Sequence, residues 1–538
     1  MDPVDTGRRK EHWSPVLIGG LAAVLLFWNL GDRYLWQDEA ATAVLAQRML
    51  RFGRPMAYDG VNLITLDVDA ASAPGMDERT GDPRAAIDYL RRAHAFKADT
   101  TWKWQPWGLF VPPAASFLML GPTTFAARLP FALAGLGTVL LLFRLARRYG
   151  GGTLVASLAA LLLALNPYWI LHARQCRYSS LSSLFLVATL LGYVRWQTGR
   201  RWGAAAFVAA AWCWFQVDYG TVWPVFAVLF ADAFLGNVRD WWRTLRVGVV
   251  LAAALAPFVY YYELWRRGNL GGIMAGKFSH NLFNVNEYVV PVVILLAAVA
   301  LLAGRWKQFD RMERRLVGVC CAMVAAMVVW VPEVSEYAFV RYVTIVAPAG
   351  ALLTAWLLVR GLGARAPRLG WLGLVVLVAT PWLSLPVRPM APAPEVVPVS
   401  FWVREEWGQL YGSIFLHLPD PNRTVIEWLR RNAKASDEIL INYEDVPLMF
   451  YLPNPIRGGI AAFRVEDDAR TPPRFVVLRE SAAFVREGPY RRELARYQWA
   501  AESVHAPDVP WGNNPDPTAQ GYDPREAEDL FVARRVGR

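Results

Sequence analysis

The sequence predicts a polytopic α-helical membrane protein with about 11 transmembrane helices, interfacial helices in its first outside loop, and a small extracytoplasmic α/β domain near its C-terminal end. Of the 538 residues, 55% are hydrophobic, and they come in long uncharged runs such as 16–30, 154–165 and 289–303. Runs of roughly 18 apolar residues are long enough to cross a bilayer. The 25 tryptophans and 20 tyrosines suit the interfacial belts of membrane proteins.

The apolar runs favour eleven membrane spans and one helix that lies flat. The stretch 105–120 is short and contains Pro106, Pro112 and Pro113, which suits an interfacial helix better than a full crossing. The predicted spans are 14–31, 123–143, 152–169, 178–196, 203–217, 221–236, 247–264, 288–304, 316–331, 342–359 and 369–385.

The basic residues predict the orientation. If 105–120 lies flat, five basic loop clusters join the N-terminal one on a single side of the membrane, which the positive-inside rule makes cytoplasmic. The net charge of +11 follows from this bias, so we do not expect nucleic acid as a partner. We expect a bacterial-type inner (plasma) membrane with the N-terminus in the cytoplasm. The clusters are Arg8/Arg9/Lys10, Arg144/Arg147/Arg148, Arg195/Arg200/Arg201, Arg239/Arg243/Arg246, Arg305/Lys307/Arg311/Arg314/Arg315 and Arg360/Arg365/Arg368.

Two parts of the chain are expected on the outer side. The first is the loop 32–122 of a membrane module that covers 1–386, and the second is a soluble domain at 387–538. After a proline-rich start, that domain has helical spacing at 423–433 and short apolar runs at 438–442 and 475–478 that indicate buried strands. This pattern is typical of a small α/β domain.

An acidic pair, Asp38-Glu39, opens the first outside loop. An apolar helical pattern follows it and stops at Gly53, so the pair lies at a helix N-terminus just beyond the first span. One interpretation is that the two carboxylates only cap this helix and balance its dipole. The other is that they supply a general base or orient a substrate.

Further polar residues fall at the predicted outer ends of spans and in the outer loops. Taken singly, each arginine can be an anchor for lipid headgroups. Taken together, the arginines form a cationic rim that suits a phosphate, because guanidinium groups match phosphate oxygens. The residues are Arg128, Arg174, Arg177, Tyr178, Asp218, Tyr219, Lys277, His280, Arg341 and Tyr342.

The order of these motifs resembles that of the GT-C glycosyltransferases. The protein O-mannosyltransferase group and the lipid A aminoarabinose transferases (the glycosyltransferase family 39-like group) are the nearest in pattern, and the resemblance covers about residues 14–385. The matching pieces are Asp38-Glu39-Ala40, Gln105-Pro106, 121–130 (GPTTFAARLP), 174–178 (RQCRY), and Arg341-Tyr342 followed by Pro348.

The resemblance implies an inverting transfer of a sugar from a polyprenyl-phosphate carrier on the extracytoplasmic face. Asp38 would be the base toward the acceptor, and Glu39 would assist it. The carrier phosphate would be bound by Arg174, Arg177 and Arg341 beside Tyr178 and Tyr342, with Arg128, Gln105, Asp218, Lys277 and His280 as further candidates. The acceptor could be a lipid, a glycan or a protein.

Two departures from the family pattern bear on the substrate. Relatives carry His-Pro-Pro or Lys-Pro-Pro where this chain has Gln105-Pro106-Trp107, which affects the expected contact with the donor phosphate. The second carboxylate that the aminoarabinose enzymes carry after their third span is replaced here by Arg177-Tyr178. That difference argues against lipid A modification as the specific reaction.

The residues leave other readings open. No cofactor is clearly indicated, although Asp38 and Glu39 could hold a divalent cation. A transporter or flippase of lipid-linked sugars would need charged groups near the middle of the membrane, whereas the predicted spans carry charges mainly at their ends. A non-catalytic scaffold that recruits envelope proteins is a third reading.

Overall fold

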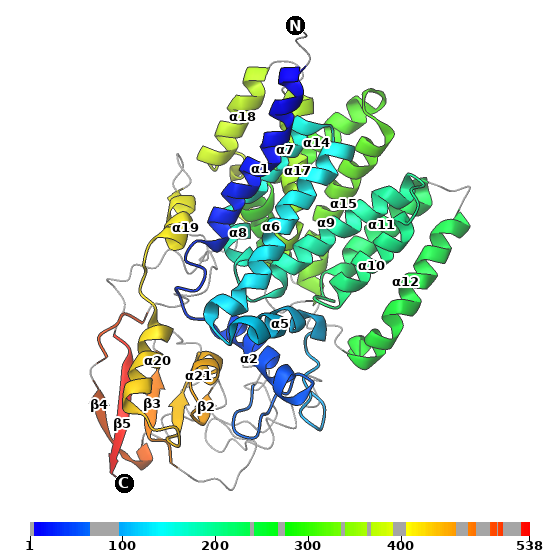
Figure 1. The fold of residues 1–538 in the computed structure, drawn as a ribbon. Coiled ribbons are helices and arrows are strands. Elements are labelled where there is room, and N and C mark those ends of the chain that lie inside the picture. Colours follow the sequence, from blue (N-terminus) through cyan, green and yellow to red (C-terminus); the bar gives the residue numbers. More distant parts are fainter. Residues whose placement is uncertain are drawn as a thin grey trace. The chain divides into compact units, whose positions relative to one another are not determined.

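The computed structural model describes most of the chain. The described residues are 5–64, 96–236, 241–266, 275–334, 339–362, 367–390, 405–458, 472–479, 495–502, 504–508 and 529–537. They form two compact units (Figure 1). The first unit holds the described residues of 1–28 and 129–415, and the second holds those of 29–128 and 416–538 apart from a short piece at 516–518.

The first unit is helical, and its helices lie in all eleven ranges that the sequence predicts as spans. Among the described residues, four helices are long and apolar enough to cross a membrane, or six if each of two bent pairs counts as one span. A polytopic helical membrane protein is therefore confirmed, while the number and direction of the crossings stay predictions. The helices are α1 (Asp5–Phe27), α6 (Thr124–Tyr149, whose first turn belongs to the second unit), α7 (Thr153–Ala164), α8 (Pro167–Ala173), α9 (Tyr178–Gln197), α10 (Gly203–Phe215), α11 (Val222–Gly236), α12 (Trp241–Tyr261), η3 (Leu264–Arg266), α13 (Ala275–Asn284), η4 (Val285–Val289), α14 (Val292–Gly304), η5 (Trp306–Gln308), α15 (Arg311–Val334), α16 (Val340–Val343), η6 (Thr344–Val346), α17 (Ala347–Trp356), η7 (Leu357–Leu362), α18 (Pro367–Ala379), η8 (Leu385–Met390) and α19 (Glu405–Phe415).

Two of the apolar helices are broken, and side chains satisfy the backbone groups that the breaks release. Helices α7 and α8 meet at 68°, and the α13–η4 helix meets α14 at 80°. At the first break, Asn166 accepts from the Trp169 N–H and donates to the Tyr288 carbonyl, both at 3.0 Å. At the second, Asn286 accepts from the Val292 N–H at 3.0 Å. Such partners are required because an unsatisfied backbone group is costly in an apolar environment.

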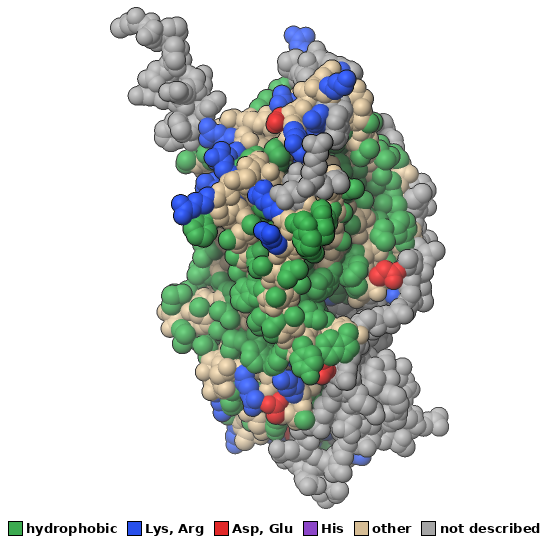
Figure 2. Space-filling model, turned by 90° about the vertical axis from the view of Figure 1, so that its right-hand side faces the viewer, with side chains coloured by type: hydrophobic (Ala, Val, Ile, Leu, Met, Phe, Trp, Pro, Cys, Tyr) green, Lys and Arg blue, Asp and Glu red, His purple; other side chains and the backbone are tan. Residues whose placement is uncertain are grey.

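Figure 2 shows hydrophobic side chains gathered over the middle of one face, with lysines and arginines above and below them and more of them above. Large apolar side chains are exposed along several helices of the first unit, including Leu17, Leu133, Val249, Leu296 and Trp371. Exposed apolar surface of this extent is unusual in soluble proteins. It suits helices whose outer faces contact lipid.

Helices α9 and α10 approach each other closely through two glycines. A Cβ added at Gly192 would lie 2.6 Å from the Phe207 backbone nitrogen, and one added at Gly203 would lie 2.5 Å from the Trp196 nitrogen. Small residues at helix contacts allow this approach, which supports helix packing in membranes.

We expect Gly192→Ala to destabilise the first unit by roughly 1–3 kcal/mol, because the added methyl group forces the two backbones apart. The matched control is Gly318→Ala in α15, where an added Cβ meets nothing within 4 Å. Thermal unfolding in detergent should show a lower Tm for the first variant and an unchanged or slightly raised Tm for the second. Equal Tm values would contradict the close packing of α9 and α10.

The second unit combines the predicted outside loop, 32–122, with the C-terminal part of the chain. The loop supplies α2 (Gln37–Phe52), η1 (Trp107–Leu109), α5 (Val111–Leu120) and the first turn of α6. The C-terminal part supplies α20 (Pro421–Asn432), α21 (Asp445–Tyr451) and a five-stranded sheet of order β2-β1-β3-β5-β4. Helix α2 packs against both α5 and α21.

The sheet is mixed, with its most buried strands in the middle. β1 (Ile439–Ile441) pairs parallel with β2 (Ile456–Gly458) and β3 (Phe475–Leu478), while β5 (Phe531–Gly537) pairs antiparallel with β3 and β4 (Gln498–Glu502). β1 and β3 lie where the sequence predicts strands, because both are continuous apolar runs. β4 and β5 are neither continuous apolar runs nor strictly alternating, so the sequence did not predict them as strands.

The observed grouping differs from the predicted division at residue 386. Backbone groups that precede α2 are held by side chains from α20 and α21: the Tyr34 N–H donates to Asp420 Oδ2 at 2.7 Å, and the Leu35 N–H donates to the Tyr451 hydroxyl at 3.0 Å. The Tyr34 and Tyr451 rings also stack, with centroids 4.1 Å apart. The loop and the C-terminal elements therefore fold as one unit.

Candidate functional site

The acidic pair lies in the first turn of α2, as predicted. The preceding residue, Trp36, gives the helix no side-chain cap. Asp38 is half-buried, whereas Glu39 has an exposed fraction of 0%. The two adjacent carboxylates therefore occupy different environments: Glu39 is fully buried, and Asp38 is partly exposed although its Oδ2 atom is buried.

Glu39 is paired with Arg128 in a geometry that uses both carboxylate oxygens. Arg128 Nε donates to Glu39 Oε1 at 2.8 Å, and Nη2 donates to Oε2 at 2.6 Å. Nη1 also donates to the carbonyls of Leu30 and Arg33, at 3.1 and 2.9 Å. A two-pronged pair of this kind is among the strongest that side chains form, and it fixes orientation as well as charge.

Arg128 was predicted to bind a phosphate, and the structure places it beside the acidic pair. All three of its guanidinium nitrogens donate to Glu39 or to carbonyls of residues 30–34, and its exposed fraction is only 8%. The arginine is therefore occupied in holding Glu39 and the turn before α2.

We expect Arg128→Gln to lower the stability of the second unit by about 3–5 kcal/mol, because it leaves the Glu39 charge buried without its partner. The control is Arg54→Gln, which removes an ion pair with Asp99 at 2.6 Å whose side chains are 44% and 46% exposed. An exposed pair of that kind contributes about 0–1 kcal/mol. Thermal unfolding of both variants compares them, and similar losses would argue against the importance of the buried pair.

In the first unit, the start of α9 and the region around α16 bring four predicted residues together. Tyr178 lies close enough to Arg177, Arg341, Tyr342 and Asp218 to interact electrostatically with each. The Arg177 guanidinium lies 5.4 Å from the centre of the Tyr178 ring, and that of Arg341 lies 5.5 Å from the Tyr342 ring. The Tyr178 hydroxyl is buried and has no hydrogen-bond partner among the described residues. Two cations therefore flank an unused hydroxyl donor.

Arg174 has a different environment from its neighbour. Its two Nη atoms donate to the carbonyls of Leu25 and Trp28, at the C-terminal end of α1. Those carbonyls lack partners within the helix, and a cation there also opposes the helix dipole. Arg174 therefore closes α1, which favours Arg177 and Arg341 as the stronger phosphate candidates.

The remaining candidates come from other elements, and of these Asp218 lies near Tyr178. Lys277 and His280 are on α13, which packs against α16, the helix that carries Arg341. Asp218 lies between α10 and α11 and accepts from Thr221 Oγ1 at 2.5 Å and from the Gly220 N–H at 2.9 Å. Gln105 belongs to the second unit and accepts from Trp102 Nε1 at 3.3 Å.

A group of polar residues around the start of α2 was not predicted from the sequence. Gln37 donates to Asp445 Oδ1 at 2.7 Å, and Asn422 donates to Glu444 Oε2 at 3.2 Å. The sequence does contain an indication of this group, because the acidic pair Glu444-Asp445 directly follows the strand predicted at 438–442. Side chains beyond the carboxyl ends of parallel strands often form sites.

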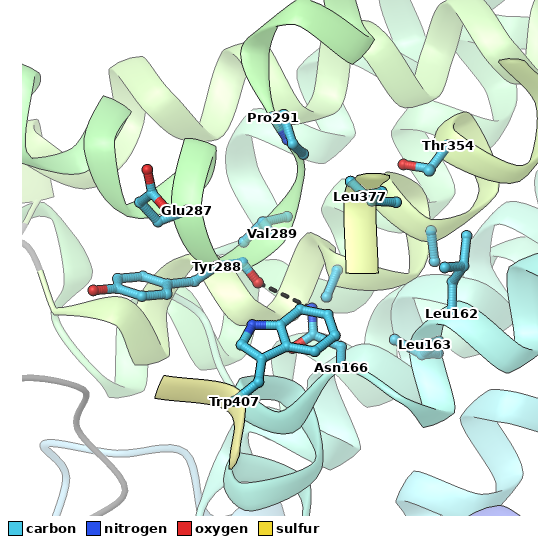
Figure 3. Close-up of a pocket in the computed structure, with 12 residues that line it drawn as sticks. Leu162, Leu163, Asn166, Glu287, Tyr288, Val289, Pro291, Thr354, Leu377 and Trp407 are labelled. Carbon is cyan, nitrogen blue, oxygen red and sulfur yellow. Dashed lines mark hydrogen bonds between the residues drawn. The ribbon is translucent and has the colours of Figure 1, made fainter. Parts of the chain in front are cut away.

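A separate cavity of about 50 Å³ lies in the first unit at the two helix breaks (Figure 3). It is bounded by Asn166, Tyr288 and Glu287, and the indole of Trp407 from α19 lies beside Asn166. Among the described residues that line it, none belongs to the predicted site. No group of three or more metal-binding side chains is found in the described parts of the chain either.

Comparison with known proteins gives two matches in sequence. Residues 112–262 match the family model of the dolichyl-phosphate-mannose-protein mannosyltransferases. The probable peptidoglycan glycosyltransferase FtsW of Halorhodospira halophila (strain DSM 244 / SL1) is 31% identical over 190 residues, which cover 30% of this chain and 48% of FtsW. The chain thus spans about half the length of this curated relative.

Solved structures match over nearly the whole chain. ArnT from Cupriavidus metallidurans bound to undecaprenyl phosphate has a TM-score of 0.56 at 16% identity, covering 97% of this chain and 98% of ArnT. Its apo state gives 0.60 at 15% identity, with 97% of each chain covered. The archaeal oligosaccharyltransferase AglB from Archaeoglobus fulgidus, in complex with an inhibitory peptide and a dolichol-phosphate, gives 0.53 at 10% identity, covering 92% and 73%. At these identities the likeness concerns the fold.

Proposed function

We propose that this chain is a membrane glycosyltransferase of the GT-C type that transfers a sugar from a polyprenyl-phosphate carrier to an acceptor. The reaction takes place on the extracytoplasmic face and inverts the anomeric centre. Relatives of the same fold support the class of donor, because ArnT is bound to undecaprenyl phosphate and AglB to a dolichol-phosphate. The acceptor is a lipid, a glycan or a protein.

The proposal rests on the different surroundings of the two acidic residues, Asp38 and Glu39. Glu39 is buried, and both oxygens of its carboxylate accept from Arg128. Asp38, one residue earlier on the same helical turn, is partly exposed. Because Glu39 fixes the turn, the Asp38 side chain starts from a fixed backbone position. A base held in place in this way can act without first being ordered.

The proposed reaction needs only one proton transfer and one displacement. Asp38 takes the proton of the acceptor hydroxyl as its oxygen attacks the anomeric carbon of the donor. The bond between that carbon and the phosphate oxygen breaks, and polyprenyl phosphate leaves with the electron pair. Attack from the face opposite the leaving group inverts the configuration.

Arg177 and Arg341 supply the charge that the leaving phosphate needs. Both lie beside Tyr178, whose buried hydroxyl is a further donor. Cationic groups placed where negative charge develops stabilise the transition state, and they do so strongly when water is excluded. The same groups would hold the carrier phosphate before the reaction.

We expect Asp38→Asn to abolish sugar transfer while the protein still folds, because the amide cannot accept the acceptor proton. Transfer from undecaprenyl-phosphate-linked mannose, glucose or aminoarabinose by the purified chain measures this, with Tm as the test of folding. Asp99→Asn, which alters an exposed carboxylate of the same unit, serves as the control. Full activity of Asp38→Asn, or no transfer from any of these donors by the unchanged chain, would contradict the proposal.

We expect Arg341→Gln to raise the donor KM by roughly 10–100-fold, because a hydrogen bond to a charged group contributes about 1.5–3 kcal/mol. The control is Arg200→Gln, an exposed arginine in a predicted cytoplasmic loop. Titrating the donor in a steady-state assay compares the two. A donor KM that changes equally little in both variants would assign Arg341 to lipid anchoring instead.

A further inference from the structure

In the second unit, the first turns of α2 and α21 are capped by each other's side chains. The Gln37 amide oxygen accepts from the Val446 N–H at 3.3 Å, and its Nε2 donates to Asp445 Oδ1 at 2.7 Å. In return, the Glu444 carboxylate accepts from the backbone N–H of Gln37. Gln37 is the first residue of α2, and Glu444 directly precedes α21.

This exchange replaces caps that neither helix makes for itself. The N-cap residues are Trp36 for α2 and Glu444 for α21, and neither accepts from its own helix. The first N–H groups of a helix have no intrahelical partner and are costly to bury alone. Each helix therefore depends on the other for its start, although Gln37 and Asp445 are 408 residues apart in the chain.

Glu444 is held in this place at a cost to stability. It is 4% exposed. Its backbone has φ 64° and ψ 37°, a left-handed conformation that residues other than glycine rarely adopt. It also lies close enough to Asp38 for the two carboxylates to repel each other. Strain and a buried like charge at one residue are typical of functional positions rather than of structural ones.

A chain of hydrogen bonds through Asn422, Arg479 and Asp508 holds Glu444 in place. Asn422 Nδ2 donates both to Glu444 Oε2 at 3.2 Å and to the Leu35 carbonyl at 3.1 Å. The orientation of that amide is set by Arg479, whose Nη1 donates to Asn422 Oδ1 at 2.9 Å and whose Nε donates to Asp508 at 2.6 Å. The chain of contacts thus runs from the end of β3 to the residues just before the acidic pair.

We infer that Glu444 is a positioning residue for Asp38: by capping α2 at Gln37, it sets where the proposed base stands, and it makes the C-terminal sheet a working part of the catalytic centre. This inference rests on the proposed role of Asp38. It adds that the charge of Glu444, and not only the presence of its side chain, is needed for full activity.

The charge of Glu444 should change within the physiological pH range. Burial raises its pKa to about 7, and Asp38 acts in the same direction, while Arg479 and the hydrogen bonds from Asn422 and Gln37 act in the opposite one. Burial also raises the pKa of the adjacent Asp445. Because the folded-state pKa of Glu444 lies above its ordinary value of 4.5, protonation stabilises the folded state. That stabilisation is complete below about pH 4.5 and is lost as the pH rises through 7.

The test is Glu444→Gln, compared with Glu438→Gln. The second variant alters a buried carboxylate beside the same sheet, paired with Arg457 at 3.1 Å. For Glu444→Gln at pH 8 we expect a Tm above that of the unchanged chain, a kcat lower by about 10–100-fold, and a donor KM within about twofold. The change in activity near pH 7 that we expect for the unchanged chain should also be absent from the Glu444→Gln variant. For Glu438→Gln we expect a lower Tm with kcat and the pH profile unchanged.

A rise in stability together with a fall in kcat is a result that a merely structural contact cannot give. Gln37→Met, which keeps the size of the side chain but removes its hydrogen bonds, should also lower kcat. If Glu444→Gln keeps the kcat and pH profile of the unchanged chain, or if its Tm and kcat fall together, the inference is wrong. These outcomes are read against Asp38→Asn: if that variant keeps its activity, it is the proposed function that fails.

Discussion

The buried ion pair between Glu39 and Arg128 is the interaction on which the rest of the second unit depends. A carboxylate with no exposed surface needs a permanent counter-charge, and the two-pronged geometry leaves it a single orientation. Because Arg128 also donates to the carbonyls of Leu30 and Arg33, the turn before α2 is drawn toward the first turn of α6. With Glu39 anchored and α2 capped at Gln37, Asp38 has little backbone freedom left. The position of the half-buried Asp38 therefore depends on the fully buried Glu39.

The membrane helices could be predicted well from the sequence, since lipid-facing and buried positions are both apolar and produce long runs. Their interruptions could not. The predicted span 288–304 begins in the structure as the end of a π-helical segment, then breaks at Pro291 before α14 starts at Val292. What permits the break is Asn286, whose side chain accepts from the Val292 N–H and donates to the Ser384 carbonyl. A partner 98 residues away leaves no trace in a local pattern.

The site shows the same limit for single residues. Asp38 and Glu39 could be found because two acids just beyond an apolar run are conspicuous. The arginines look alike in sequence, yet Arg128 holds a carboxylate, Arg174 closes a helix, and Arg177 lies against a tyrosine ring. Which of these an arginine does depends on the carbonyls and carboxylates that the fold brings within reach. The contacts of Gln37 could not be predicted for the same reason, because its partners lie far along the chain.

The exchange of caps between α2 and α21 has a consequence for biosynthesis. Helix α2 leaves the ribosome early, but the residues that complete its first turn come 408 positions later. At about 5–20 residues per second, translation needs roughly 20–80 s to cover that distance. During this time the residues that complete the acidic turn have not yet been synthesised. In the proposed enzyme, a nascent or interrupted chain that does not reach Glu444 therefore lacks the cap that this residue gives to the helix of Asp38.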